Sequence, residues 1–353
     1  MNHLLKPLSD VYGWGVRQRE SAFRRGWLKS RRLGRPVISV GNLSAGGSGK
    51  TPIVALIAEI LLRYGYRPAI LTRGYRRERG ASLLALAPQQ ERSPDPRKTG
   101  DEPALLARKL PAVPILVCSD RYCAGRYAEK CFGADVHILD DGFQHFALAR
   151  DLDLAAVDVT QELSDGALLP AGRLREPPTA LARADMIVLT RVELQNPAPL
   201  ERFVRSINPR AQIFHCSTAL RALNKVGGNQ TKPPETYRGV PLCAFCGIGN
   251  PQGFFSDLRG WGYTISSEAI FRDHHLYTEK DLEQLLKKAR ACSAVAMITT
   301  EKDVMNLPSK WKSEIPILAC VTQADISDRE AFEQAIFAKL QPQNKRQTVA
   351  SAI

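Results

Sequence analysis

The sequence contains no apolar run of about 18 residues, which is the length that an α-helix needs to cross a lipid bilayer. Its N-terminus lacks the apolar core of a signal peptide, so we expect the chain to remain in the cytosol. Internal repeats are absent, and so are the helix-turn-helix, RRM and zinc-finger patterns of nucleic-acid-binding proteins. We therefore expect neither a membrane-spanning nor a secreted protein, and no nucleic acid as a partner.

Metal-binding and disulfide patterns are also scarce. The 353 residues include six histidines and eight cysteines, and the only close cysteine pair is a single CxxC, Cys243 and Cys246. Because that pair lies in an apolar run, we expect both thiols to pack in the core. The hydrophobic content of 44% and the charged content of 24% are those of an ordinary globular protein, and the length predicts two domains.

The stretch from Val37 to Ile60 has a clear chemical meaning. It consists of an apolar strand-like run, a loop with four glycines, the pair Lys50-Thr51 and an apolar pattern of helical period. This is the arrangement of P-loop nucleotidases, in which loop N–H groups and a helix N-terminus surround phosphate oxygens. The lysine reaches the β- and γ-phosphates, and the threonine hydroxyl ligates Mg²⁺.

This P-loop pattern deviates at one position, because the strict motif requires a glycine where the chain has Ser44. The rest of the loop is intact and follows a predicted strand, so we interpret it as a nucleotide site rather than a structural turn. The residues predicted to contact ATP are Ser44, Ala45, Gly46, Gly47, Ser48, Gly49, Lys50 and Thr51.

A second apolar run, ending at Leu139, is followed by the acids Asp140 and Asp141. In P-loop proteins a carboxylate at this place holds Mg²⁺ directly or through water. The alternative is that the acids only cap a helix, and the P-loop favours the metal hypothesis. Gln144 and His145 follow in a turn, at the strand edge where ligands bind in open α/β sheets.

Two arginines and an acid, Arg173, Arg175 and Glu176, lie in a loop that contains prolines. Arginines at such a place can stabilise phosphate charge in the transition state of phosphoryl transfer. The alternative is a surface turn, and the spacing alone does not decide between the two.

The first 35 residues carry nine basic and two acidic side chains, which is a local net charge of +7. This is over half of the chain's net charge of +13. On a helical wheel of residues 5–35, most basic side chains fall on one side. The other side collects the apolar residues Leu5, Leu8, Tyr12, Val16, Phe23 and Trp27. Such a helix is typical of a membrane interface, and the alternative is a helix docked on its own domain with a solvated basic face.

Apolar strand-like runs that alternate with helical segments predict an α/β fold with a mostly parallel sheet flanked by helices. We expect an N-terminal amphipathic helix (1–35), a P-loop domain (36–210), a linker (211–240), a smaller α/β domain (241–340) and a loose tail (341–353).

Nine short blocks follow one another along the chain. They are GNLSAGGSGKTP (41–52), TRGY (72–75), GDEP (100–103), SDR (119–121), LDDGFQH (139–145), LPAGRLREP (169–177), AFCGIGNPQGFF (244–255), FRDHH (271–275) and TTEKD (299–303). In this order the blocks closely resemble those of the tetraacyldisaccharide 4′-kinase family, the lipid A 4′-kinases of Gram-negative bacteria. The resemblance covers nearly the whole chain, and Ser44 fits the loop of this family.

The resemblance implies ATP-dependent phosphorylation of the 4′-hydroxyl of a tetraacylated glucosamine disaccharide 1-phosphate, with lipid IVA as the product. It also implies ATP and Mg²⁺ as cofactors, a glycolipid substrate, and a peripheral location at the cytoplasmic face of the bacterial inner membrane. A basic amphipathic helix agrees with an anionic membrane surface as partner.

The resemblance further implies roles for single residues. Asp101, His274 and Asp141 are the candidate catalytic residues, with Asp101 as the base and His274 paired with it across the interdomain cleft. Thr51, Asp140 and Glu176 are the candidate metal contacts, and the candidate phosphate and substrate contacts are Arg121, Gln144, His145, Arg173 and Arg175. The sequence alone leaves open which of Asp101, Asp140 and Asp141 is the base.

Two other functions are compatible with a P-loop and an amphipathic helix. A membrane-bound ATPase switch of the MinD/ParA type has both features, but it carries a signature lysine where this chain has Ala45. A nucleotide-dependent binding module would bind ATP without transferring phosphate. Radiolabelled ATP separates the three functions, because only a kinase moves the label into lipid.

Overall fold

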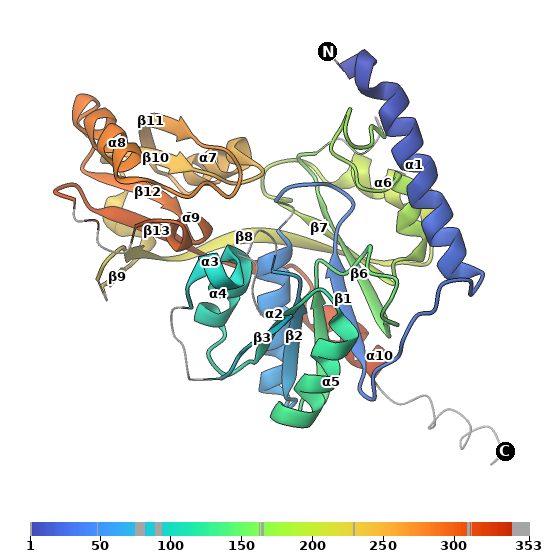
Figure 1. The fold of residues 1–353 in the computed structure, drawn as a ribbon. Helices are drawn as coiled ribbons and strands as arrows, with labels where there is room; N and C mark the ends of the chain where they lie inside the picture. Colours follow the sequence, from blue (N-terminus) through green and yellow to red (C-terminus); the bar gives the residue numbers. More distant parts are fainter. Residues whose placement is uncertain are drawn as a thin grey trace.

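The computed structural model describes residues 2–47, 49–74, 82–88, 94–161, 163, 166–228, 230–308, 311 and 313–340. In this part of the chain, thirteen strands form one sheet in the order β11-β10-β12-β13-β8-β7-β6-β1-β5-β2-β4-β3, with β9 paired to β8. Helices lie on both faces of the sheet (Figure 1), which confirms the expected α/β class. Ser48 and the expected tail at 341–353 lie outside the described residues.

The half of the molecule that contains the P-loop is built on six parallel strands. They are β1 (Val37–Gly41), β2 (Pro68–Thr72), β4 (Ile115–Cys118), β5 (Val136–Asp140), β6 (Leu152–Asp158) and β7 (Met186–Thr190), and β3 (Leu83–Leu86) pairs antiparallel with β4 at the edge. Every residue of the six parallel strands is buried. A strand covered on both faces has no polar side, which explains the continuous apolar runs in the sequence.

Helices cover this half on both faces because successive strand residues point to opposite sides. Ile38 and its neighbours on one face pack against α2 (Lys50–Arg63), α4 (Asp101–Lys109) and α10 (Arg329–Leu340). Val37 and its neighbours on the other face pack against α5 (Arg121–Phe132). The same face also carries η1 (Pro178–Arg183) and α6 (Ala198–Ile207), while α3 (Pro96–Thr99) precedes α4.

The second half repeats this architecture on a smaller scale. Its parallel strands are β10 (Pro241–Cys246), β11 (Thr264–Ile270), β12 (Ala296–Thr300) and β13 (Ile317–Ile326). One face packs against α7 (Pro251–Gly260) and the other against α8 (Glu279–Ala291), while α9 (Glu301–Met305) follows β12 directly. Both thiols of the Cys243–Cys246 pair are buried in this core.

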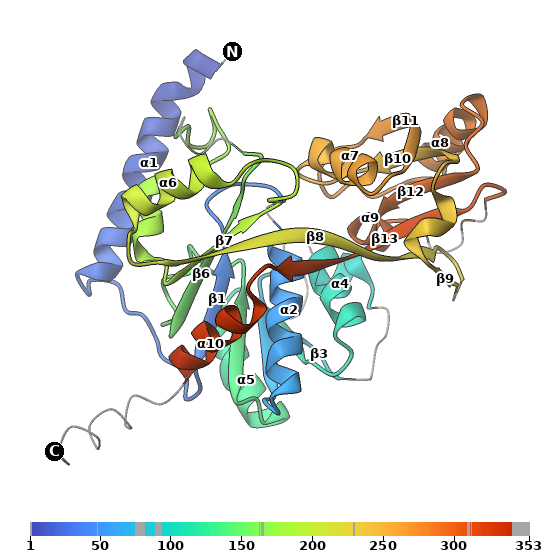
Figure 2. The same ribbon diagram turned by 180° about the vertical axis from the view of Figure 1, so that it is seen from behind.

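Two long strands connect the halves. The segment expected as a linker contains β8 (Gln212–Lys225), β9 (Thr231–Lys232) and η2 (Pro234–Tyr237). Strand β8 pairs with β7 through its first part and antiparallel with β13 through the rest (Figure 2). After β13, helix α10 returns to the P-loop half, where Glu333 pairs with Arg63 at 2.5 Å. The division of the chain into domains at 36–210 and 241–340 stays a prediction. Strands β8 and β13 run from one half to the other.

Helix α1 (Asn2–Arg24) lies along one side of the P-loop half (Figure 1). The Ser9 hydroxyl donates to the carbonyl oxygen of Leu168 at 2.9 Å, and the Tyr12 hydroxyl donates to that of Arg175 at 3.0 Å. These bonds dock the helix on its own domain. Within the described residues, no helix has the length and apolar character of a membrane span.

The helix ends earlier than the sequence pattern predicts. It stops at Arg24, and Gly26 then takes a left-handed backbone with φ of 75°, which a helix cannot continue through. The expected apolar side is also divided. Tyr12, Val16 and Phe23 are half-buried, whereas Leu8 and Trp27 are exposed. Part of that side therefore contacts the domain, and part faces solvent.

Candidate active site

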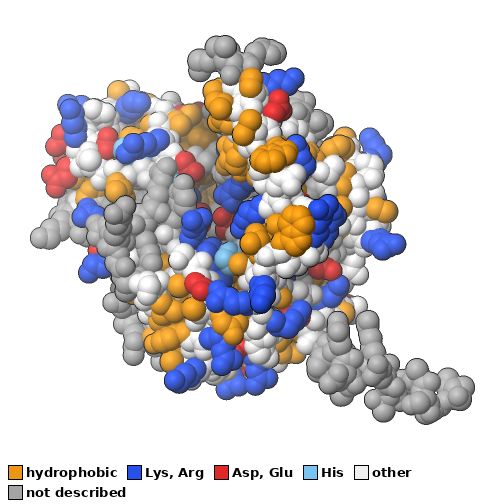
Figure 3. Space-filling model, turned by 45° about the vertical axis from the view of Figure 1, so that its right-hand side comes forward, with side chains coloured by type: hydrophobic (Ala, Val, Ile, Leu, Met, Phe, Trp, Pro, Cys, Tyr) orange, Lys and Arg blue, Asp and Glu red, His pale blue; other side chains and the backbone are white. Residues whose placement is uncertain are grey.

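A cleft of about 840 Å³ opens between the two halves, and the P-loop lies at its base. Its walls come from α1, α4 and residues 140–146 on one side, and from α7, residues 273–274 and α9 on the other. Figure 3 shows this hollow beside α1, with basic and acidic side chains in it. Because parallel strands end at one edge of the sheet, the polar residues that follow β1, β5, β7 and β12 converge there.

The P-loop lines the cleft with its backbone. Gly46 and Gly49 have φ values of 117° and 75°, which favour glycine. Ser44 is buried, and the N–H of Ala45 donates to the carbonyl oxygen of Arg173 at 2.7 Å, so the start of the loop is tied to a neighbouring loop. The predicted ATP contacts that line the cleft are Ala45, Gly46, Gly47, Gly49, Lys50 and Thr51.

The Lys50 side chain reaches the cleft from the first turn of α2. Its Nζ donates to Asn42 Oδ1 at 2.8 Å and lies 3.2 Å from Asp141 Oδ1. Arg175 binds both oxygens of the same carboxylate, at 2.9 and 2.7 Å. Burial alone would raise the pKa of Asp141, but the charges of Lys50 and Arg175 hold it well below its usual value. Two cations therefore converge where phosphate oxygens can take the place of a carboxylate.

Asp140 ends β5 and is fully buried beside the P-loop. Its Oδ2 accepts a hydrogen bond of 2.9 Å from the Thr72 hydroxyl. Burial and the carboxylates of Glu102 and Asp141 raise the pKa of Asp140 to about 7. Acids gathered in this way favour a bound cation, and oxygen donors are the ligands that Mg²⁺ prefers. The donor set, completed by the hydroxyl of Thr51 in the same cleft, fits Mg²⁺.

Glu176 is 1% exposed and lies beneath the cleft surface. Its Oε2 contacts the Arg183 guanidinium and accepts a bond of 3.0 Å from Gln144 Nε2. Gln144 also donates to the carbonyl oxygen of Asn42 at 2.9 Å. These contacts connect the two loops that follow β1 and β5. A metal contact by Glu176 stays a prediction. Its ion pair with Arg183 gives Glu176 a structural role as well.

Arg121 and His145 both line the cleft. Arg121 begins α5, is 5% exposed, and donates from Nη1 to the carbonyl oxygen of Ser119 at 3.0 Å. Burial and the positive charges of Arg121, Arg150 and Arg19 lower the pKa of His145 to about 4. The ring is therefore neutral at physiological pH, and it can accept or donate a hydrogen bond.

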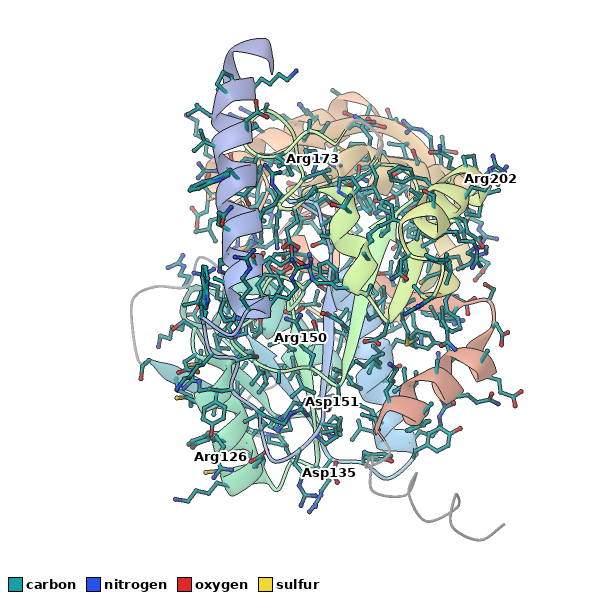
Figure 4. All side chains as sticks on the ribbon, turned by 90° about the vertical axis from the view of Figure 1, so that its right-hand side faces the viewer. Arg126, Asp135, Arg150, Asp151, Arg173 and Arg202 are labelled. Atoms are coloured by element: carbon teal, nitrogen blue, oxygen red, sulfur yellow. The ribbon has the colours of Figure 1, made fainter. Side chains whose placement is uncertain are left out.

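The two arginines of the LPAGRLREP block have different positions. Arg175 lines the cleft and binds Asp141. Arg173 (labelled in Figure 4) donates from Nη2 to the carbonyl oxygen of Gly249 in the second half, and it lies over Gly46 of the P-loop. The structure thus brings Arg175 to the reacting end of the cleft and places Arg173 at the contact between the halves.

Asp101 and His274 meet across the cleft from opposite halves. Asp101 begins α4 and is 7% exposed, and its Oδ2 lies 2.7 Å from His274 Nδ1. His274 has a left-handed backbone, φ 58°, and its N–H donates to the carbonyl oxygen of Gly247 at 2.9 Å. A non-glycine residue in this conformation is held by its surroundings and often marks a functional site.

The sequence analysis assigned no role to several residues that the structure brings into the cleft. They are Tyr12 and Arg19 from α1, Glu102 from α4, and Lys302 from α9. Glu102 and Lys302 belong to the GDEP and TTEKD blocks, so their place in these blocks was the available signal. Tyr12 and Arg19 carried no such signal, because their contacts depend on how α1 docks.

Comparisons with known proteins cover nearly the whole chain. A family model for tetraacyldisaccharide-1-P 4′-kinases matches residues 1–341. The tetraacyldisaccharide 4′-kinase of Geobacter metallireducens is 37% identical over 334 residues, which are 94% of this chain and 96% of that relative. The tetraacyldisaccharide 4′-kinase of Koribacter versatilis is 38% identical over 333 residues, with 93% and 96% of the two chains covered.

A solved structure is similar across both halves. The crystal structure of LpxK from Aquifex aeolicus in complex with ATP matches with a TM-score of 0.75 and 28% sequence identity. The match covers 96% of this chain and 99% of that chain.

Proposed function

Since the chain belongs to the family of tetraacyldisaccharide-1-P 4′-kinases, we propose how its residues divide the work of the reaction. The reaction is ATP-dependent phosphorylation of the 4′-hydroxyl of tetraacyldisaccharide 1-phosphate to lipid IVA, in lipid A biosynthesis. The kinase predicted from the resemblance is confirmed, and the comparisons do not favour an ATPase switch. The proposals below concern the site residues, the metal and the membrane.

Asp101 is the base that accepts the proton of the 4′-hydroxyl. The observation that carries this role is its 2.7 Å contact with His274 in the same cleft as Lys50. Burial alone would raise the pKa of Asp101, but the hydrogen bond with His274 and the charge of Lys302 keep it below its usual value. An ionised carboxylate that is fixed by a neighbouring ring is ready to accept a proton, which is worth about 10²- to 10⁴-fold in rate.

Lys50, Arg175 and Arg121 stabilise the charge on the transferred phosphoryl group. Phosphoryl transfer requires positioning and charge stabilisation more than covalent chemistry. The Lys50 and Arg175 cations now share the Asp141 carboxylate, and ATP offers them phosphate oxygens in its place. Asp141 would then be free to orient these two cations, which keeps it among the catalytic candidates.

Thr51 and Asp140 hold Mg²⁺, with Glu176 as a further candidate. Among the described residues, no three His, Cys, Asp or Glu side chains form a ready cluster for a metal. Mg²⁺ usually takes one or two protein oxygens and completes its shell with water and phosphate. When bound, the ion neutralises charge on the β- and γ-phosphates. Asp140 is buried and its pKa is raised, so its ionised form needs a nearby cation.

The glycolipid occupies the side of the cleft that α1 covers. Tyr12, Val16 and Arg19 of α1 line it, together with Gln144 and His145. Arg19 Nη1 donates to the carbonyl oxygen of Gln144 at 3.2 Å, which ties the helix to the substrate loop. Apolar and cationic groups in one wall match a substrate with acyl chains and phosphate.

The outer face of α1 contacts the membrane. Leu8, Val11 and Trp14 expose 57%, 67% and 61% of their surface, and Arg17 and Arg24 of the same helix are also exposed. Figure 3 shows hydrophobic and basic side chains together along α1. Apolar side chains beside basic ones are typical of a helix that lies in an anionic interface. We place the protein at the cytoplasmic face of the bacterial inner membrane, as a peripheral protein.

One assay tests the reaction and the proposed base. The protein is incubated with γ-labelled ATP, Mg²⁺ and tetraacyldisaccharide 1-phosphate in mixed micelles, and the label is followed into lipid. Label in lipid that disappears in Asp101→Asn, while ATP binding persists, supports the proposed base. Full activity of Asp101→Asn would refute it.

A further inference from the structure

Lys302 reaches the Asp101–His274 pair from the second half of the molecule. It lies in α9, directly after β12, and its Nζ is 3.4 Å from His274 Nε2 and 3.3 Å from Glu102 Oε1. Asp273 Oδ1 lies 3.6 Å away and Asp101 Oδ2 lies 4.0 Å away. The ammonium therefore sits between the catalytic pair and two further acids.

The contact with His274 fixes where the ring carries its proton. A lysine ammonium has three donors and no acceptor, so a ring nitrogen that faces it must accept. His274 Nε2 therefore has no hydrogen, and the ring proton lies on Nδ1, which faces Asp101 Oδ2 at 2.7 Å. Asp273 Oδ2, at 3.7 Å from Nε2, is farther from that nitrogen than the lysine is.

We propose that Lys302 is a positioning residue for the phosphoryl transfer, because its ammonium keeps His274 in the neutral Nδ1–H form and Asp101 ionised. The proposal rests on Asp101 acting as the base. Lys302 itself touches neither the phosphoryl group nor the sugar in this role. It acts through the ring that orients the base.

The surrounding charges show why a cation is needed at this place. Asp101 of α4 and the neighbouring Asp273 lie within ion-pair distance of the ring, and Lys302 of α9 lies near both of these carboxylates and near Glu102. A cation placed among these carboxylates offsets their mutual repulsion. Burial alone would lower the pKa of Lys302, but Glu102, Asp101 and Asp273 raise it above its usual value, so the lysine stays charged across the physiological range.

A second lysine in the same interface supplies a matched control. Lys109 of α4 pairs with Glu301 of α9 at 2.6 Å and donates to the carbonyl oxygen of Thr322 at 2.8 Å. It therefore ties the same two helices together with comparable burial, and its ion pair and hydrogen bond go to Glu301 and Thr322 rather than to the Asp101–His274 pair. Loss of Lys109 removes a bridge between α4 and α9 but leaves the charge beside the ring.

The test is the pH dependence of kcat/KM for Lys302→Gln, Lys302→Arg and Lys109→Gln in the labelled-ATP assay. Loss of the ammonium raises the pKa of Asp101, so a higher pH is needed to keep the base ionised. We expect the acidic limb of Lys302→Gln to move up by about one pH unit, so its deficit in kcat/KM is about tenfold on the acidic side of the limb and disappears on the neutral side. Lys302→Arg should bring the acidic limb most of the way back to its wild-type pH, and Lys109→Gln should leave the limb at its wild-type pH.

An unmoved limb in Lys302→Gln, or an equal shift in Lys109→Gln, would overturn the proposal. If Lys302→Gln fails to fold, nitrogen NMR of His274 in the wild-type protein decides. We expect a protonated Nδ1 and an unprotonated Nε2 between pH 6.5 and 8.5, and the opposite tautomer or an imidazolium contradicts the proposal. A fully active Asp101→Asn variant would instead refute the base itself, so the two failures are distinguishable.

Discussion

The Asp101 carboxylate and the His274 imidazole lie 2.7 Å apart although 173 residues separate them in the chain. Asp101 begins α4 in the P-loop half, and His274 lies between β11 and α8 in the second half. Neither half contains both groups, so the pair exists only when the cleft is assembled. The proposed base therefore depends on the relative position of the halves.

Replacing Asp101 with asparagine tests the base directly. We expect kcat to fall by about 10²- to 10⁴-fold while ATP affinity is kept, because a base acts in the transition state. The measurements are steady-state turnover and ATP binding by calorimetry. A variant that loses only ATP affinity would assign Asp101 to structure or metal binding.

Lys50→Ala should abolish transfer, because its ammonium is the P-loop cation at the phosphate end of the cleft. We expect a loss of at least about 10²- to 10³-fold in kcat, the range for removing one group that stabilises transition-state charge. Lys280→Ala, an exposed lysine on α8, is the matched control and should retain full activity. Substantial turnover by Lys50→Ala would remove the P-loop from the mechanism.

The two neighbouring arginines should respond differently to truncation. Arg175→Ala removes a cation from the cleft and releases Asp141, so we expect a loss of about tenfold or more in kcat. Arg173→Ala loses a contact to Gly249 between the halves, so the effect should lie mainly in KM. Equal losses in kcat for both variants would contradict the distinct positions proposed for them.

Membrane binding should depend on the outer face of α1. Changing Leu8, Val11 and Trp14 together to serine should reduce co-sedimentation with anionic vesicles several-fold, since each exposed side chain would lose its burial in the interface. The control is an equal change at three other exposed apolar residues, Tyr127, Ile270 and Val295. Unchanged sedimentation of the α1 variant would favour a helix that only docks on its own domain.

Asp120→Ala should destabilise the P-loop half. Asp120 caps α5 by accepting bonds from Tyr122 N and Cys123 N at 3.0 and 3.1 Å, and loss of such a cap costs about 1 kcal/mol. The bond from Arg31 lowers the pKa of Asp120 to about 2. A carboxyl with a lowered pKa in the folded state stabilises the fold at pH values above its unfolded pKa. This stabilisation is lost as the pH falls through the folded-state pKa, so the free energies of unfolding of wild type and variant should converge between about pH 4 and pH 2.

Urea unfolding at pH 7 and at pH 3 measures this difference. Arg31→Met is the control, because it removes the exposed ion pair and keeps the cap. A larger loss in Arg31→Met than in Asp120→Ala would place the stabilising contact in the ion pair.

The P-loop and the buried strands could be read from the sequence because each is a local pattern. Glycines, Lys50 and Thr51 are adjacent in the chain, and strands buried on both faces need continuous apolar residues. The length of β8 could not be read this way, because its second part is held by pairing with β13, about a hundred residues later. The end of α1 was also missed, since the wheel pattern continues past the left-handed turn at Gly26.

The sequence by itself determined the family, the fold class and which residue types carry the chemistry, since these are written in contiguous blocks. Only the tertiary structure decided which of those residues meet. Lys50 and Arg175 share the Asp141 carboxylate, and Arg173 contacts Gly249 of the opposite half. Lys302 lies beside the His274 ring. The reason is topological. The strand order and the long strands β8 and β13 bring segments that are distant in the chain to one edge of the sheet. No local sequence pattern encodes the distances between these segments.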